Sequence, residues 1–403
     1  MSSNAITIRD VKTILTQPPG LPRLVVVKVL TSEPGLCGVG CATFTQRHHA
    51  VAAAVEHHLK PFVLGREISR IEELWQMMMV HGYWRNGPVL NNAISGVDQA
   101  LWDIKGKIAG LPVYELFGGK SREAAHVYVH ANGSSPDEVL EEVRALVAQG
   151  YRFVRVQMGG YGGKASDLIK PEGAQSGAYF DPRSYTRNTL NMIEHVRSEI
   201  GDNIELLHDV HERLAPVDGV QFAKDVEEFR LFFLEDVLSP EDLEWFRFVR
   251  QQTATPLAMG ELFNHPREWQ PLITERLIDF IRMHVSQMGG ITPAWKVAAF
   301  ASMFGIRTAW HGPADTSPVG HAANLHLDLW AHNFGVQEWC QFPEIVYEIF
   351  PGTPEVRNGY MYPNAIPGLG IDVNESLAAK FPCKDSVETW TQTRLPDGSS
   401  TRP

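Results

Sequence analysis

Three apolar segments that each end in a carboxylate decide the fold of this chain: IELLHD at residues 204–209, LFFLE at 231–235 and PLAMGE at 256–261. Their final residues, Asp209, Glu235 and Glu261, follow one another at intervals of 26 residues. One strand, one helix and two loops together need about that many residues. Each interval is therefore expected to add one β/α unit and to return the chain to the same edge of a parallel sheet.

The alternation of strands and helices extends on both sides of these segments. Ser135, Pro136 and Glu138 have the spacing of a helix-starting capping box, and Gly150 is expected to end that helix. Eight strands separated by helices predict an α/β fold, a TIM-like (β/α)8-type barrel or its modified (β/α)7β form. The eight expected strands are His126–His130, Phe153–Gln157, Ile204–His211, Leu231–Glu235, Pro256–Glu261, Leu277–Arg282, Gly305–His311 and Phe334–Glu338.

The first part of the chain has a different pattern. Two apolar segments, Leu24–Val29 and Cys37–Phe44, flank a turn and predict a hairpin. A helix is expected to begin at Pro88 and to end before Gly110, with one apolar face that includes Leu90 and Ile108. Strands followed by helices indicate a separate α+β domain. The expected domains are a cap at residues 1–120, a barrel at 121–374 and a C-terminal tail at 375–403 that packs on the cap.

The composition is that of a globular protein with excess negative charge. The 403 residues include 36 Lys and Arg against 47 Asp and Glu, a formal net charge of −11, so neither nucleic acid nor an anionic membrane is expected as a partner. No stretch of about 18 uncharged apolar residues occurs, and Met1–Asp10 lacks the regions of a signal peptide. We therefore expect a cytoplasmic protein whose four cysteines are reduced thiols.

The three strand-end acids predict a metal site. In a barrel, the edge formed by the strand C-termini holds the active site. Asp209, Glu235 and Glu261 would repel one another there unless a cation neutralised them. Ligation by oxygen alone favours Mg²⁺ over zinc and leaves positions for water or substrate. The alternative is a set of unrelated acids in surface ion pairs.

Histidines near these acids are candidates for acid–base chemistry. His211 lies two residues after Asp209, so both are expected on the same side of an extended strand. His208 points the other way and is expected to be structural, whereas His311 follows another strand. The pairs His48-His49 and His57-His58 have no carboxylate at ligand spacing and are expected to form a solvated face.

Six motifs together resemble the enolase superfamily and, within it, the mannonate dehydratase subgroup. This resemblance covers nearly the whole chain. It implies an Mg²⁺-dependent dehydration of a sugar acid, such as D-mannonate or D-gluconate, to a 2-keto-3-deoxy acid through an enolate. The motifs are AISGVDQALWDIKGK at 93–107, YVHANG at 128–133, LHDVH at 207–211, GELFN at 260–264, HGPAD at 311–315 and GVQE at 335–338.

The resemblance also implies roles for individual residues. Mg²⁺ would bind Asp209, Glu235 and Glu261, and His211 would protonate the departing 3-hydroxyl. A divalent cation stabilises the charge that develops on an enolate. The residues implied to face the substrate are His130, His211, Glu261, Arg282, His311, Asp315 and Glu338.

Some positions depart from the patterns of related enzymes. Racemases of the superfamily carry Lys-x-Lys on the second strand, where this chain has Arg155-Val156-Gln157, and His284 replaces their sixth-strand Asp. Both departures favour a dehydratase. The mannonate subgroup pairs its second-strand Arg with a Tyr twelve residues later, but Asp167 stands there.

The general base therefore has several candidates. Arg155 cannot give up its proton alone, but it can lower the pKa of a nearby phenol. We expect the base to be Tyr161 paired with Arg155, with Tyr179 as the next candidate and His311 as the alternative. Residues from Gly159 to about Arg187 are expected to form an irregular active-site lid. Two other functions stay open, an epimerase and a weakly active or inactive sugar-acid-binding regulator, and we expect a homo-oligomer.

Overall fold

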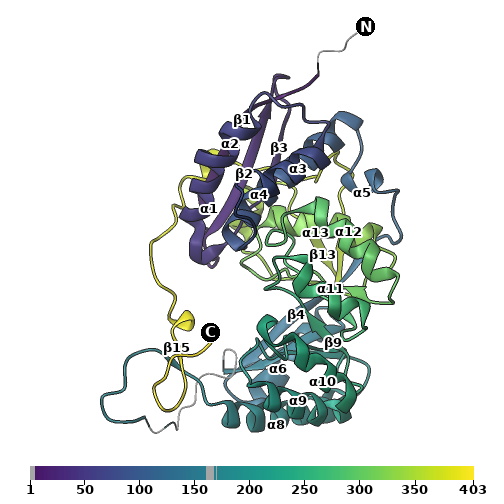
Figure 1. Cartoon of the computed structure of the whole chain (residues 1–403). Helices are drawn as coiled ribbons and strands as arrows, with labels where there is room; N and C mark the ends of the chain where they lie inside the picture. Colours follow the sequence, from purple (N-terminus) through teal and green to yellow (C-terminus); the bar gives the residue numbers. More distant parts are fainter. Residues whose placement is uncertain (1–4, 160–167, 169) are drawn as a thin grey trace. The chain divides into compact units, whose positions relative to one another are not determined.

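The computed structural model describes residues 5–159, 168 and 170–403, which form two compact units (Figure 1). Unit 1 comprises Met1–His126, Glu261–Trp269 and Arg282–Asp385. Unit 2 comprises Val127–Gly260, Gln270–Ile281 and Ser386–Pro403. Both units are assembled from segments that are far apart in the sequence. Among the residues described, no helix is long and apolar enough to cross a membrane.

Unit 1 begins with an antiparallel sheet of three strands, β1 (Ile8–Thr16), β2 (Leu24–Thr31) and β3 (Cys37–Cys41), with β2 in the centre. The valines of β2 are fully buried because the strand has a neighbour on each edge and its side chains fill the core. The pairing of β2 with β3 confirms the expected hairpin, although β3 ends before Phe44.

Helix α4 (Pro88–Ala109) packs closely on β3 (Figure 1). A Cβ atom on Gly40 would lie 2.1 Å from the Gly96 carbonyl oxygen, so this approach requires glycine. The helix starts at Pro88 and stops at Gly110, whose φ of +67° is left-handed, as expected. The expected apolar face is wrong at its ends, because Leu90 and Ile108 are exposed. The other helices in this part of unit 1 are α1 (His48–Ala54), the π-helical turn η2 (Val55–Leu59), α2 (Lys60–Val63), α3 (Ile71–Val80) and α5 (Val113–Leu116).

The later segments of unit 1 add short strands and helices. Thr308 of β11 (Arg307–Thr308) forms a parallel bridge with Phe334, which precedes β12 (Gln337–Glu338). Helix α13 is capped at Ser317, whose hydroxyl accepts a hydrogen bond from Gly320 N. The other elements are α12 (Ile291–Ser302), α13 (Pro318–Trp330), α14 (Glu344–Ile349), β13 (Glu355–Arg357), β14 (Tyr360–Tyr362) and α15 (Glu375–Ala378).

Unit 2 is built on parallel strands in the order β4, β5, β7, β8, β9 and β10. Helix α6 begins with the expected cap, because Glu138 N donates to Ser135 Oγ, and Gly150 follows its end with a φ of +96°. The strands are β4 (Ala125–Gly133), β5 (Phe153–Met158), β7 (Glu205–Asp209), β8 (Phe233–Glu235), β9 (Leu257–Met259) and β10 (Phe280–Ile281). The helices are α6 (Pro136–Ala148), α8 (Pro182–Ile200), α9 (Pro216–Asp225), α10 (Phe246–Gln252) and, from Gln270 onward, α11 (Pro266–Thr274).

All eight strands expected from the alternation are present, with shorter bounds in most cases. The irregular segment ends sooner than expected, because β6 (Ala178–Tyr179) and the start of α8 at Pro182 precede Arg187. Strand β6 pairs in parallel with β15 (Thr393–Arg394) near the end of the chain. Neither of these two-residue strands was predicted from the sequence, because each is too short to show the alternation of apolar and polar residues that is typical of a strand.

Candidate active site

Two carboxylates of unit 2 lie side by side at strand ends. Asp209 is the last residue of β7 and Glu235 the last of β8, and the parallel register pairs them directly. Both are buried, with 1% and 0% of their surface exposed. A third acid, Asp236, joins them, and one oxygen from each of the three lies within 4.8 Å of the others. The register therefore places Asp209 and Glu235 at the same edge of the sheet, whereas Glu261, the third acid of the expected set, is not part of this group.

Asp236 was missed by sequence reasoning for a physical reason. In an extended strand it would point away from its neighbour Glu235. Its φ of +41° is left-handed, so the strand geometry ends at Glu235 and the alternation no longer applies. The sequence carried no signal for this turn, because aspartate at a strand end is common in loops of many kinds.

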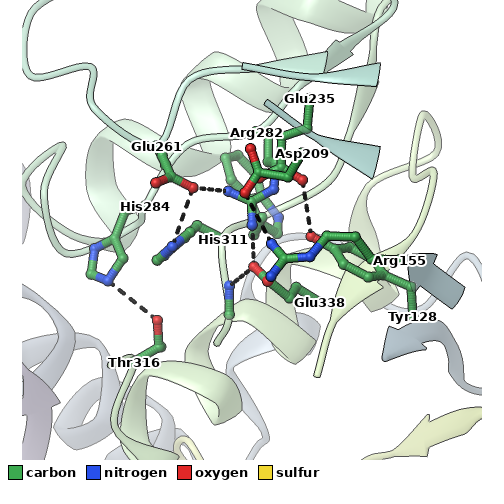
Figure 2. Close-up of polar contacts among 12 residues, drawn as sticks. Tyr128, Arg155, Asp209, Glu235, Glu261, Arg282, His284, His311, Thr316 and Glu338 are labelled. Carbon is green, nitrogen blue, oxygen red and sulfur yellow. Dashed lines mark hydrogen bonds and ion pairs between the residues drawn. The ribbon is translucent and has the colours of Figure 1, made fainter. Parts of the chain in front are cut away.

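The acids of unit 2 are contacted by polar groups from neighbouring strands (Figure 2). Arg155 Nη1 on β5 donates to Asp209 Oδ2 at 3.1 Å, and its Nη2 lies 3.3 Å from His130 Nδ1 on β4. The Tyr128 hydroxyl donates to Glu235 Oε2 at 3.5 Å. Arg155 brings one positive charge to a group with three buried carboxyls. Burying like charges together is costly, so this arrangement favours a bound cation.

Two histidines lie close to Asp209 in the sequence, His208 and His211, and their surroundings in the structure differ. His208 is buried, and burial lowers its pKa to about 4. Its Nδ1 is 2.8 Å from Val156 O and its Nε2 is 2.8 Å from the Tyr185 hydroxyl. A neutral imidazole can form both of these hydrogen bonds at once, so the His208 ring has a structural role.

The expectation that His211 shares an extended strand with Asp209 is wrong. Strand β7 ends at Asp209, and His211 has a left-handed φ of +56°. The two residues are instead linked through the backbone, since His211 N donates to Asp209 Oδ1 at 2.7 Å. The His211 ring faces the last segment of the chain, with Nδ1 3.1 Å from Pro403 O and its centroid 6.2 Å from that of Trp390.

Unit 1 holds a second group of charged residues, centred on Arg282 (Figure 2). Arg282 is fully buried and donates from Nη1 to Glu261 Oε2 at 2.5 Å and from Nη2 to Glu338 Oε2. Glu338 also accepts from Gly312 N at 2.9 Å. His311 Nε2 lies 3.4 Å from Glu261 Oε2. The structure therefore brings together four residues that the resemblance assigned to substrate binding.

Asp315 and His284 complete this second group. Burial raises the pKa of Asp315, and together with the nearby carboxylates of Glu261 and Glu338 it brings the value to about 7. Burial and the Arg282 charge lower the pKa of His284 to about 4. His284 Nδ1 accepts from Gln287 N, so Nε2 carries the hydrogen and donates to the Thr316 hydroxyl at 3.2 Å. Near neutral pH the site thus offers a partly protonated carboxyl beside a neutral imidazole.

Of the two tyrosines considered for the general base, the structure describes only Tyr179. Tyr161 and position 167 lie outside the described residues. Tyr179 is buried in β6, and its hydroxyl donates to Gln175 O at 2.8 Å. The ammonium group of Lys170 lies 4.2 Å from the centroid of its ring. These contacts hold the phenol of Tyr179 within its own loop.

Two family models match the sequence. Residues 10–118 match the mandelate racemase/muconate lactonizing enzyme N-terminal domain. Residues 138–377 match the enolase C-terminal domain-like family. The chain therefore belongs to the enolase superfamily, which confirms the fold class of an α/β barrel-type domain with an N-terminal capping domain.

Within the superfamily, the chain's relatives are D-galactonate dehydratase family members. The protein of this name from Musicola paradisiaca is 51% identical, and the alignment covers 99% of each chain. A second, from Pantoea ananatis, is 52% identical over 98% of this chain and 99% of its own. A crystal structure of an enolase from Pantoea ananatis with bound D-gluconate and Mg is 51% identical and has a TM-score of 0.96. It matches 99% of this chain and 100% of the other.

Proposed function

We propose that this protein is an Mg²⁺-dependent hydro-lyase that converts a sugar acid, an aldonate such as D-mannonate or D-gluconate, to a 2-keto-3-deoxy acid through an enolate. The observation that carries the proposal is the buried pair of Asp209 and Glu235, joined in register at two strand ends. Support also comes from a solved relative of 51% identity that contains D-gluconate and Mg.

Three acids are proposed to hold one Mg²⁺: Asp209, Glu235 and Glu261. Asp209 and Glu235 are the last residues of β7 and β8, and Glu261 comes two residues after the end of β9. All three offer carboxylate oxygens, the donors that Mg²⁺ prefers. Asp236 adds negative charge beside the first two. When bound, the ion supplies positive charge that favours loss of the proton next to the substrate carboxylate.

Other residues of the chain are proposed to bind the sugar acid and move its protons. His211 is the general acid for the departing 3-hydroxyl, and Arg155 with Tyr161 is the base. His311 is the alternative base, because its Nε2 already faces a carboxylate. Asp315, with its raised pKa, can donate a hydrogen bond to a hydroxyl or carboxylate. The proposed substrate-binding residues are His130, His211, Glu261, Arg282, His311, Asp315 and Glu338.

A second candidate function is sugar-acid binding with little or no turnover. The observation that favours it is Asp167, which stands where the mannonate subgroup has its tyrosine. An epimerase is favoured less, because Arg155-Val156-Gln157 replaces the Lys-x-Lys pattern. Turnover separates these candidates, since a regulator binds an aldonate without releasing product.

We also propose how the chain is organised and where it acts. Residues 1–120 form the cap and residues 121–374 the barrel, which the matches at 10–118 and 138–377 support. The tail at 375–403 is proposed to pack on the cap, which the contact of Ala378 with Thr16 supports for its first part, whereas Ser386–Pro403 belongs to unit 2. All four cysteines are free thiols, which is typical of a reducing cytoplasm. The protein is proposed to act as a homo-oligomer on a small molecule.

Screening purified protein with Mg²⁺ against a library of aldonic acids tests the function. The expected result is formation of a 2-keto-3-deoxy acid from at least one of them. Activity should be lost in EDTA and return with Mg²⁺, and Asp209→Asn should be inactive at all Mg²⁺ concentrations. Binding of an aldonate without any product would support the regulator instead.

A further inference from the structure

A cluster of two histidines and one acid lies in unit 1, apart from the residues proposed for catalysis. His48 and His49 begin helix α1, and Asp385 approaches them from a position 336 residues later than His49. His49 Nε2 is 2.9 Å from Asp385 Oδ1, and His48 Nε2 is 3.8 Å from the same oxygen. The two rings are 4.0 Å apart between centroids, so both side chains lie on one side of the helix start.

His48 is the unusual member of the cluster. It is only 6% exposed, and neither of its ring nitrogens has a hydrogen-bond partner among the residues that the structure describes. The backbone of Thr45 is near the ring without reaching hydrogen-bond geometry. A buried polar nitrogen without a partner costs free energy, because it has given up its hydrogen bonds to water. Burial also lowers the pKa of His48, so a neutral imidazole faces Asp385.

An ordinary surface ion pair does not account for this arrangement. His49 and Asp385 are 64% and 79% exposed, and an exposed pair of this kind contributes little stability. Such a pair also leaves both buried ring nitrogens of His48 without a hydrogen-bond partner among the described residues. A metal ion between the three side chains accounts for both observations, because neutral imidazole nitrogen is a good ligand for a transition metal.

The spacing of the three ligand atoms fits such an ion. Ligands held at about 2.0–2.1 Å in a tetrahedron are about 3.3 Å from one another. The distances from Asp385 Oδ1 to Nε2 of His49 and of His48, 2.9 and 3.8 Å, lie on either side of that value, and all three ligand atoms lie within 4.8 Å of one another. We propose that His48, His49 and Asp385 form a binding site for a divalent transition-metal ion such as Zn²⁺, with water as the fourth ligand. Two nitrogens and one oxygen distinguish this site from the all-oxygen site proposed for Mg²⁺.

The surroundings of the cluster set limits on its affinity. The guanidinium of Arg23 is near enough to lower the pKa of His48, and its charge also opposes a metal cation. Arg23 is engaged with the backbone, since it donates to Lys384 O at 2.7 Å and to Thr45 O at 3.3 Å. These contacts fix the two segments that carry the ligands. Asp385, the last residue of unit 1, would then be tied by the metal to the start of α1.

Metal binding to untagged, Mg²⁺-saturated protein tests the proposal. Zn²⁺ is titrated by calorimetry, and Co²⁺ reports a tetrahedral site by its visible absorption. The parent should bind one equivalent more than His49→Asn or Asp385→Asn, whose altered side chains are exposed and leave the fold intact. The double variant His57→Asn/His58→Asn is the matched control, because it alters the neighbouring exposed histidine pair. It should bind like the parent.

Two results would overturn the proposal. One is equal binding by the parent and both single variants, and the other is an affinity weaker than about 0.1 mM for the parent, too weak for three cooperating ligands. A second measurement is tryptic cleavage after the exposed Lys384, which precedes the ligand Asp385. Zn²⁺ should slow this cleavage severalfold in the parent but not in His49→Asn, where the cleaved sequence is unchanged. Equal cleavage rates in both proteins would also count against the site.

Discussion

Arg155 Nη1 donates to Asp209 Oδ2 at 3.1 Å while Nη2 of the same guanidinium lies 3.3 Å from His130 Nδ1. The planar fork of the arginine thus holds a proposed metal ligand on one side and a proposed substrate-binding residue on the other. A lysine at this position would keep the charge but could not maintain both contacts, because its ammonium group is a single point.

We therefore predict that Arg155→Lys lowers kcat/KM for dehydration by a factor on the order of 10–100 while the fold is retained. Steady-state kinetics and circular dichroism check the two parts of this statement. Arg144→Lys is the matched control, because Arg144 forms an exposed ion pair with Glu199 and should show parent activity. Full activity of Arg155→Lys would mean that charge alone suffices at this position.

His211 is predicted to be the general acid. His211→Asn should reduce dehydration by a factor on the order of 10²–10⁴, because asparagine keeps the polarity of the side chain but cannot deliver a proton. Mg²⁺ affinity should change little, since the contact with Asp209 is made by the His211 backbone. Kinetics and Mg²⁺ titration measure both quantities. Unchanged turnover would move the acid role to His311.

The identity of the base can be read from exchange of the substrate C2 proton with deuterated solvent. If Tyr161 with Arg155 removes this proton, Tyr161→Phe should slow exchange by a factor on the order of 10² or more. Tyr179→Phe serves as the control, because the Tyr179 hydroxyl is already bound to Gln175 O. Exchange at the parent rate in Tyr161→Phe would favour His311 as the base.

Acid is predicted to destabilise the protein through its buried neutral histidines. Burial lowers the pKa of His208 from 6.5 to about 4. Below pH 6.5 the unfolded chain binds a proton at this histidine, whereas the folded protein binds it only near pH 4. Stability is therefore lost as the pH falls through this window. His208 contributes about 2 kcal/mol of loss between pH 7 and pH 5.

Urea unfolding in EDTA at both pH values measures this loss. His208→Asn should have a smaller difference in unfolding free energy between pH 7 and pH 5 than the parent. The exposed control His57→Asn should match the parent. An identical pH dependence in His208→Asn and the parent would show that His208 is protonated in the folded state.

Much of the fold could be predicted because periodicity and strand spacing are local properties of the sequence. Asp209 and Glu235 were placed at neighbouring strand ends from the apolar segments that they end and from the interval between them, and the register confirms the pairing. The start of α4 at Pro88 and its end at Gly110 follow from the backbone preferences of these two residues.

The features that escaped prediction depend on single dihedral angles or on distant segments. Left-handed φ values at His211 and Asp236 change where these side chains point, and no periodicity reports them. The expectation that His48 is solvated was wrong, because this side chain is buried in the folded chain, where it lies 3.8 Å from the distant Asp385. Sequence spacing cannot pair two residues more than 300 positions apart.

The discontinuous make-up of unit 1 has a consequence for synthesis on the ribosome. Gln17 N donates to Phe381 O at 2.7 Å, and the Thr16 hydroxyl donates to Ala378 O at 3.0 Å. Strand β1 leaves the exit tunnel long before Ala378 and Phe381 are made, so it must wait for more than 300 further residues to complete these contacts. At about 5–20 residues per second this delay lasts from roughly 20 to 70 s. During that time the apolar valines of β2 depend on their local hairpin, or on a chaperone, for protection from aggregation.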